Sequence, residues 1–251
     1  MIGNRTWAGL GAIGLTVAAI TVSPASPVVP TPAPNRIAAN EAAAIQSLRE
    51  VAAAQARFRA AVDVDTNCDG VGEYGYFAEL AGSKAMRVGP PGACTPQAGY
   101  SPQDILTPPL LRPEFGEVAY SCVVHRGYLF QIWLPTQTYG GGPIDAQRED
   151  CTGGKMAAPF PDPVNGARMW CCYAWPINYN ETGQRAFFIN QRGVILECSN
   201  QIAFPFSGYY PPLNCNYRPY FDEAYSAPSD MGSPLRIGVP NANGSIWLPV
   251  H

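Results

Sequence analysis

The chain has 251 residues, of which 47% are hydrophobic, and this is enough for one sizeable core. Only 14% of the residues are charged and the formal net charge is −3, which is too weak and too mixed to steer the protein to nucleic acid or an anionic membrane. The 25 Gly and 26 Pro residues, with 13 Tyr and 10 Phe, indicate an ordered, loop-rich protein that contains β-structure.

The first 25 residues have the pattern of a secretory signal. Arg5 is the only early charge, an uncharged apolar run extends from Trp7 to Val22, and small residues follow up to Ala25. This run is shorter than the roughly 20 residues that cross a bilayer as a helix. A cleaved signal peptide over residues 1–25 is the preferred interpretation, with an uncleaved membrane anchor as the alternative. Either one predicts export, to a periplasmic, extracellular or membrane-anchored position.

A proline-rich spacer over residues 26–35 precedes a long predicted helix. Proline fixes φ and lacks a donor N–H, so the spacer is extended and the helix begins after it, near Arg36. Large apolar residues then recur at spacings of three and four, which places them on one stripe of a helix that ends at Val62: Ile45, Leu48, Val51, Phe58 and Val62. The many interior alanines favour the helix and allow close packing against a sheet.

The rest of the chain is predicted to be mainly antiparallel strands. These are a short strand over residues 73–77, a hairpin of residues 118–124 and 128–134, a third strand over residues 168–175, and a second hairpin of residues 185–190 and 193–198. Residues 82–117 and 135–167 are long connections, and the chain beyond residue 200 has few regular patterns. Because one helix precedes the strands, the predicted class is α+β, with one head domain over residues 36–251.

One segment resembles a known family. The sequence NEAAAIQSLR, Asn40 to Arg49, with Gln55 and Phe58 after it, resembles the helix of bacterial type IV pilin-like proteins and pseudopilins. The stretch GVGEYGYFAEL from Gly70 to Leu80 continues the resemblance.

The resemblance covers residues 36–80 and 117–200, and the sheet motifs are weaker than the helix motif. It implies a pilin-like head on a disulfide-stapled scaffold, with a non-enzymatic structural or interaction role at the cell envelope. No prepilin-peptidase motif precedes Asn40, so the implied head is detached from the filament-forming segment. Partners would be envelope or extracellular proteins.

An acidic loop follows the predicted helix and has the spacing of a calcium loop. Oxygen ligands at alternate positions suit Ca²⁺, because a turning loop points them inward. Residue Tyr76 stands where an EF-hand has its bidentate Glu, so the predicted affinity is weak. The alternative is a turn in which Asp and Asn side chains bond their own backbone. The predicted ligands are Asp65, Asn67, Asp69, Val71 (through its carbonyl) and Glu73.

Eight cysteines suggest disulfides and an oxidising compartment. A zinc site is disfavoured because no C-x-x-C pair occurs and His is found only at positions 125 and 251. The pairs Cys68–Cys94 and Cys198–Cys215 close the shortest loops, whereas Cys171 and Cys172 are adjacent and point to opposite faces of a strand. All eight are disulfide candidates: Cys68, Cys94, Cys122, Cys151, Cys171, Cys172, Cys198 and Cys215.

No catalytic motif is recognised. The chain has no G-x-S-x-G, no H-E-x-x-H and no Gly-rich phosphate loop, which favours a non-enzymatic protein. The alternative class is a secreted carbohydrate-binding module or hydrolase that uses aromatic C-terminal loops, because aromatic rings stack on sugars or on partner proteins. Its candidate residues are Tyr209, Tyr210, Tyr217 and Tyr220, while Trp133, Trp170 and Trp175 are expected in the core.

Overall fold

A computed structural model describes residues 34–137, 140–208 and 219–250. The chain divides into two units, residues 1–31 and 32–251, and all described residues belong to the second. The predicted signal or anchor therefore lies outside the described residues. So do Tyr209, Tyr210, Cys215, Tyr217 and His251. Within the described residues, no helix combines the length and the apolar character needed to cross a membrane.

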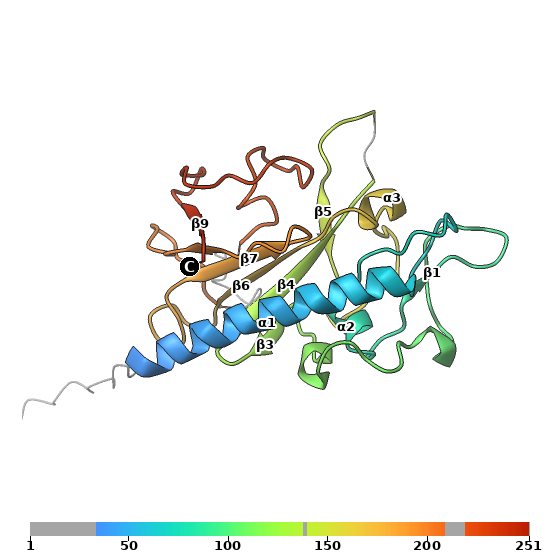
Figure 1. The fold of residues 1–251 in the computed structure, drawn as a ribbon, viewed down its shortest axis with the longest axis horizontal. Coiled ribbons are helices and arrows are strands. Elements are labelled where there is room, and N and C mark those ends of the chain that lie inside the picture. Colours follow the sequence, from blue (N-terminus) through green and yellow to red (C-terminus); the bar gives the residue numbers. More distant parts are fainter. Residues whose placement is uncertain (1–33, 138–139, 209–218, 251) are drawn as a thin grey trace, which may run out of the picture. The chain divides into compact units, whose positions relative to one another are not determined.

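Helix α1 (Pro34–Ala61) occupies the segment predicted to be helical. Its apolar stripe is buried at Leu48, Val51 and Phe58, whereas Arg49 and Arg57 are exposed. The stripe belongs to one core cluster together with residues of strands β4, β6 and β7, across which α1 runs in Figure 1. Val62 was predicted to extend the stripe, but it lies beyond the helix with a φ of 58° and is 40% exposed.

A seven-stranded antiparallel sheet forms the centre of the described unit (Figure 1). Six strands follow the order β3-β4-β6-β7-β8-β9, and β5 also pairs with β4. The predicted hairpins correspond to β3–β4 and β7–β8, although residues 118–122 and 193–195, predicted as strand, precede the observed strands. The predicted third strand corresponds to β6, and the α+β class with an antiparallel sheet is confirmed. The strands are β3 (Val123–His125), β4 (Tyr128–Pro135), β5 (Ala146–Arg148), β6 (Cys171–Pro176), β7 (Ala186–Asn190), β8 (Leu196–Cys198) and β9 (Trp247–Pro249).

Both faces of this sheet are covered. Cys172 and Ala174 of β6 belong to the cluster that contains α1, whereas Cys171 and Tyr173 belong to a second cluster, as the alternation of a strand requires. The second cluster includes residues that follow the last predicted strand: Phe206, Phe221, Ala224, Tyr225, Met231 and Trp247. Burial on both faces explains why β4 and β6 are mostly apolar along their whole length rather than alternating between apolar and polar residues.

The predicted strand over residues 73–77 is wrong. Residues 71–76 form no strand and lead into the short helix α2 (Phe77–Leu80). The backbone of Gly75 is bonded in both directions by the Gln55 side chain, at 2.9 and 2.8 Å, and Tyr74 donates to the Gly166 carbonyl at 2.9 Å. These backbone groups are therefore already used by a helix side chain and a loop, and no strand pairs with them.

The long predicted connections contain short elements that the sequence did not indicate. Residues 82–117 include β1 (Arg87–Val88), β2 (Gln97–Ala98) and two 3₁₀ turns, η1 (Pro102–Asp104) and η2 (Pro113–Gly116). Residues 135–167 include β5 and α3 (Pro163–Gly166), and β9 lies in the C-terminal region. Each has four residues or fewer, which is too short for a hydrophobic period to be recognised.

Candidate functional site

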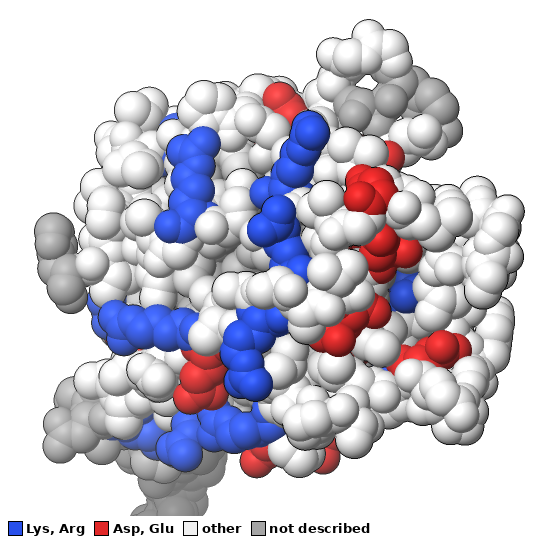
Figure 2. Space-filling view, turned by 45° about the vertical axis from the view of Figure 1, so that its right-hand side comes forward, with Lys and Arg blue, Asp and Glu red and all other residues white. Residues whose placement is uncertain are grey.

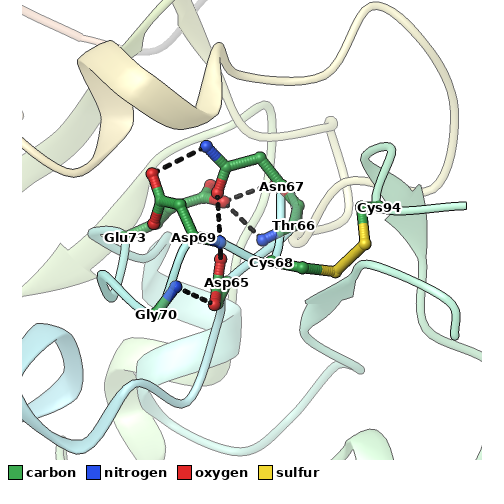
Figure 3. The surroundings of a disulfide bond; sticks show 8 residues. All are labelled: Asp65, Thr66, Asn67, Cys68, Asp69, Gly70, Glu73 and Cys94. Carbon is green, nitrogen blue, oxygen red and sulfur yellow. Dashed lines mark hydrogen bonds between the residues drawn. A yellow bond between two sulfur atoms is a disulfide. The ribbon is translucent and has the colours of Figure 1, made fainter. Parts of the chain in front are cut away.

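The acidic loop after α1 is a tight, hydrogen-bonded turn (Figure 3). The carboxylate of Asp65 accepts hydrogen bonds from the N–H groups of Asp69 at 3.1 Å and Gly70 at 2.8 Å. The Asn67 amide donates to the Asp69 carboxylate at 2.9 Å. Three of the predicted calcium ligands are thus brought together, and the acceptor oxygens of the two carboxylates bond groups of the same loop.

A disulfide fastens this loop to the segment before β2. Cys68 is bonded to Cys94, which lies 26 positions further along the sequence, with 5.4 Å between their Cα atoms. This pairing, one of the two that the sequence suggested, is confirmed. The partner suggested for Cys198 is Cys215, which lies outside the described residues.

The other two predicted calcium ligands have different surroundings. Val71 is exposed, and its N–H donates to the Asp69 carboxylate at 2.8 Å. Glu73 is fully buried, accepts from the Thr66 N–H at 2.8 Å and pairs with Arg87 at 3.0 Å. Within the described part of the chain, no three His, Cys, Asp or Glu side chains are grouped to hold a metal ion. The calcium site stays a prediction that rests on the first three residues.

Arg87 is the centre of a fully buried charge network. Its guanidinium pairs with Glu73 at 3.0 Å and with Glu79 at 2.9 Å, and it donates to the Tyr74 carbonyl. The Glu79 carboxylate also accepts from the N–H groups of Tyr76 and Arg87 itself. Two carboxylates therefore face one guanidinium, and each carboxylate and guanidinium nitrogen has a partner. Such an arrangement holds a loop in place but leaves no group free for a ligand.

A second polar cluster lies where the pairing of the sheet is interrupted. Strand β6 pairs with Tyr128–Trp133 along one edge of β4, so β3 and β5 share the opposite edge. On that edge β3 pairs with β4 as far as Phe130, and β5 ends opposite Trp133. Gln131 and Ile132 lie between these two pairings and have no strand partner on this edge. The chain leaves the sheet at this gap, and the polar residues that follow β5 gather there.

A cavity of about 380 Å³ opens at this gap, and we refer to it as the Trp133 cavity. Trp133 and Tyr220 supply its aromatic side, with their rings 5.3 Å apart and nearly edge to face. Trp133 is 3% exposed, whereas Tyr220 is 44% exposed and leaves the site accessible to solvent. The polar lining includes Ser121, Gln147, Arg148, Glu149, Asp150 and Lys155.

The lining contains buried polar atoms that have no hydrogen-bond partner. Four of them belong to cavity residues: Trp133 Nε1, Gln147 Nε2, Arg148 Nη1 and Glu149 Oε1. A fifth is Oε1 of Gln131, the β4 residue at the interrupted pairing, whose Nε2 donates to the Ser121 carbonyl at 3.0 Å. Leaving a buried polar group unpaired costs about 1–3 kcal/mol. Buried polar groups are normally hydrogen-bonded, so this cluster needs partners from outside the chain, such as water, an ion or a ligand.

Burial changes the protonation of this cluster. It raises the pKa of Glu149 to about 8, and the nearby Glu79 carboxylate acts in the same direction, against hydrogen bonds from the Gly154 and Ala78 N–H groups. Glu149 is therefore mostly neutral at pH 7. Burial, with help from Glu149, also raises the pKa of the Cys122 thiol to about 12, so this thiol is unreactive.

The remaining cysteines and His125 give weaker candidates. Cys122, Cys151, Cys171 and Cys172 are free thiols, and burial raises the pKa of both adjacent cysteines well above the usual value. His125 lies in β3 rather than in a turn, with its ring 5.5 Å from that of Phe115. Burial, together with Arg112 and Arg126, lowers its pKa, which favours the neutral imidazole.

Most of the cavity residues were missed from the sequence. Gln147, Arg148 and Glu149 fall in a segment predicted to be a loop, and their pairing with β4 comes from a strand of three residues. The available signal was the dense polar run Asp145–Asp150 within a Gly- and Pro-rich connection. Of the aromatic candidates, Tyr220 lines the cavity. Trp133, assigned to the core, combines nearly complete burial with an unpartnered N–H.

Surface charge gives no comparable candidate on the face drawn in Figure 2. Basic side chains gather toward one side of this face and acidic side chains toward the other, with uncharged residues between many of them. The mixture agrees with the formal net charge of −3. This face therefore lacks the field of a single sign that steers a polyanion.

A comparison with known protein families identifies the family of the chain. The family model described as "Protein of unknown function (DUF2950)" matches residues 33–199, and the chain belongs to this family. No curated protein and no solved structure matches the chain. The matched region includes α1, the acidic loop, the Arg87 network and strands β3 to β8, and with them Trp133, Arg148 and Glu149. Tyr220 and β9 lie beyond it.

Proposed function

We propose that this protein is an exported, non-enzymatic component of the cell envelope, whose described part is a pilin-like head with a structural or interaction role. The observation that carries the proposal is the apolar stripe of α1. Leu48, Val51 and Phe58 share one core cluster with strands β4, β6 and β7. A rigid helix–sheet unit of this kind suits the presentation of loops to a partner protein.

Export is supported by the Cys68–Cys94 disulfide. Structural disulfides persist in oxidising compartments and are rare in the cytosol. The apolar run from Trp7 to Val22, with small residues up to Ala25, would direct the chain there, as a cleaved signal or as an anchor.

Intact mass of the natively expressed protein tests this proposal. We expect a mass that begins near Ser26, with Cys68 and Cys94 protected from alkylation until reduction. A mass that retains Met1 with the same protection would indicate the anchored form. A full-length chain whose Cys68 and Cys94 react without reduction would contradict export. The Cys94→Ser variant is the matched control, because it leaves Cys68 free to react.

A second candidate function is carbohydrate recognition. It is favoured by Tyr220, a member of the aromatic C-terminal group, which lies against Trp133 at a cavity with four unpartnered polar atoms. Retention of the protein in the envelope that added sugars do not affect would favour the first proposal. Sugar binding that is lost in Tyr220→Ala would favour the second.

A further inference from the structure

We propose that the Trp133 cavity binds a saccharide that carries a carboxylate, such as a unit of a uronic acid. This inference rests on the second candidate function and names its ligand class and its residues. The carboxylate would lie at Arg148, the sugar ring beside Trp133 and Tyr220, and a hydroxyl at Glu149.

The charge of the lining favours an acidic ligand. The Arg148 guanidinium has no ion pair with the described residues, and its Nη1 is buried without a partner. The other cation of the lining, Lys155, is paired with Asp150 at 3.0 Å. Glu149 is mostly neutral at pH 7, because burial raises its pKa to about 8. Arg148 is therefore the cation of the described lining that has no ion pair, and a guanidinium binds a carboxylate through strong charge-assisted hydrogen bonds.

The hydrogen-bonding pattern favours a ligand rich in oxygen. Trp133 Nε1 and Arg148 Nη1 are both donors, and the register of β4 and β5 puts the two side chains on the same face, so the ligand must offer acceptors. Oε1 of Glu149 lacks a partner as well, and a hydroxyl group can bond a carboxyl oxygen while it accepts from another donor. A saccharide has many hydroxyl groups on a small frame, whereas a simple fatty acid has none.

The aromatic residues provide the surface for the ring. Trp133 lies opposite Arg148 in the register of β4 and β5, so the indole and the guanidinium are neighbours across the sheet edge. Tyr220 packs nearly edge to face on Trp133 and is partly exposed at the cavity. Aromatic side chains that pair an apolar body with a polar tip are common in sites of this kind.

Calorimetric titration of the full-length protein tests the inference. The probes are a galacturonate trisaccharide, the matching neutral galactose trisaccharide and inorganic phosphate. We expect the acidic trisaccharide to bind at least about tenfold more tightly than the neutral one, since a hydrogen bond to a charged group contributes more than a neutral one. Phosphate, which lacks the ring, should bind the most weakly.

Two variants locate the binding. Arg148→Gln should weaken the acidic trisaccharide about ten- to a hundredfold and leave the neutral one nearly unchanged. Trp133→Phe keeps a ring but removes the N–H, so it should weaken both sugars. Arg192→Gln removes an exposed charge elsewhere and should change neither affinity. Melting temperatures close to wild type would confirm that the variants are folded.

The outcomes separate the inference from the function on which it rests. Equal affinity for the acidic and neutral sugars would overturn the carboxylate site but leave carbohydrate recognition standing. No binding of either sugar would overturn both. Phosphate binding as tight as that of the acidic sugar would overturn the saccharide assignment, and acidic-sugar binding that Arg148→Gln does not weaken would overturn the location.

Discussion

The Arg87 network and the Trp133 cavity are two buried polar clusters that differ in whether their polar atoms have hydrogen-bond partners. Arg87 is 1% exposed, and each of its guanidinium nitrogens reaches a carboxylate or a carbonyl. At the cavity, Trp133 and Glu149 are almost as buried, yet each retains an atom with no partner. A satisfied network stabilises its surroundings, whereas an unsatisfied one accumulates an energetic cost that a ligand can remove.

The two clusters also differ in access. The Arg87 network is enclosed by α2, the acidic loop and the backbone of Tyr74. The cavity opens beside the half-exposed Tyr220, at a point where two strands share one edge of β4 without meeting. Burial of charge alone therefore does not mark a functional site in this protein. The combination of burial, missing partners and an opening is the reason that we propose the cavity as the candidate site.

The largest effect is expected from breaking the satisfied network. Arg87→Met should destabilise the protein by about 3–5 kcal/mol, because Glu73 and Glu79 would remain buried without their counter-charge. Urea unfolding followed by circular dichroism measures it. Arg112→Met breaks an exposed ion pair with Glu50 at 2.8 Å and should cost less than about 1 kcal/mol. Equal losses in the two variants would show that the Arg87 network has no special weight.

The long helix and strands were easier to predict from the sequence than either polar cluster. Helix α1 has a regular apolar stripe, and β4, β6 and β7 are mostly apolar runs, so they were predictable from local pattern. Arg87 was not singled out, because its partners Glu73 and Glu79 come from a segment whose predicted strand is wrong. Its burial is decided by the path of the loop rather than by local propensity.

The cavity was even less visible from sequence. Its lining comes from β4, from the segment around β5 and from Tyr220, which are far apart along the chain. The prediction treated Trp133 as a core residue and Tyr220 as a binding residue, and the structure places them in contact. Only the pairing of β3 and β5 with one edge of β4 brings these residues together, and sheet register of this kind depends on the whole fold.

The pH dependence of stability that Glu149 causes gives a second test of the difference between the two clusters. Its pKa of about 8 in the native protein compares with 4.5 when unperturbed. As pH rises from about 5 to about 8 the unfolded chain releases this proton while the native protein keeps it, so the free energy of unfolding should fall by a few kcal/mol. Glu223, whose pKa burial raises to about 7, adds a loss of the same sign.

Unfolding experiments at pH 5 and pH 8 measure this loss. Glu149→Gln should flatten the pH dependence and make the protein more stable than wild type at pH 8, because the amide cannot ionise. Glu223→Gln is the matched variant and should flatten only its own part. A wild-type protein whose stability rises between pH 5 and pH 8 would contradict the assignment of a neutral Glu149.

The Cys68–Cys94 disulfide should contribute to the free energy of unfolding about as much as the Arg87 network does. The two contributions can be measured separately. A bond between positions 26 apart restricts the unfolded chain, which is worth about 3 kcal/mol. The double variant Cys68→Ser and Cys94→Ser should lose that amount in urea unfolding. Cys151→Ser, which changes an exposed free thiol, should lose almost nothing. If the double variant combined with Arg87→Met loses much less than the sum, the loop and the network form one cooperative unit.

The smallest effect on stability is expected from calcium at the acidic loop. Like the Arg87 network, this loop has carboxylates that already accept hydrogen bonds. Asp65 and Asp69 already accept backbone N–H groups of their own loop. If the loop binds calcium with millimolar affinity, a tenfold excess over Kd adds about 1.4 kcal/mol and raises the Tm by about 3–6 °C relative to chelator. Asp69→Asn should abolish the rise, whereas Glu181→Gln, at an exposed site, should not. An unchanged Tm in wild type would mean that the loop is only a turn. It would then be structural, like the Arg87 network, whose polar groups also have hydrogen-bond partners.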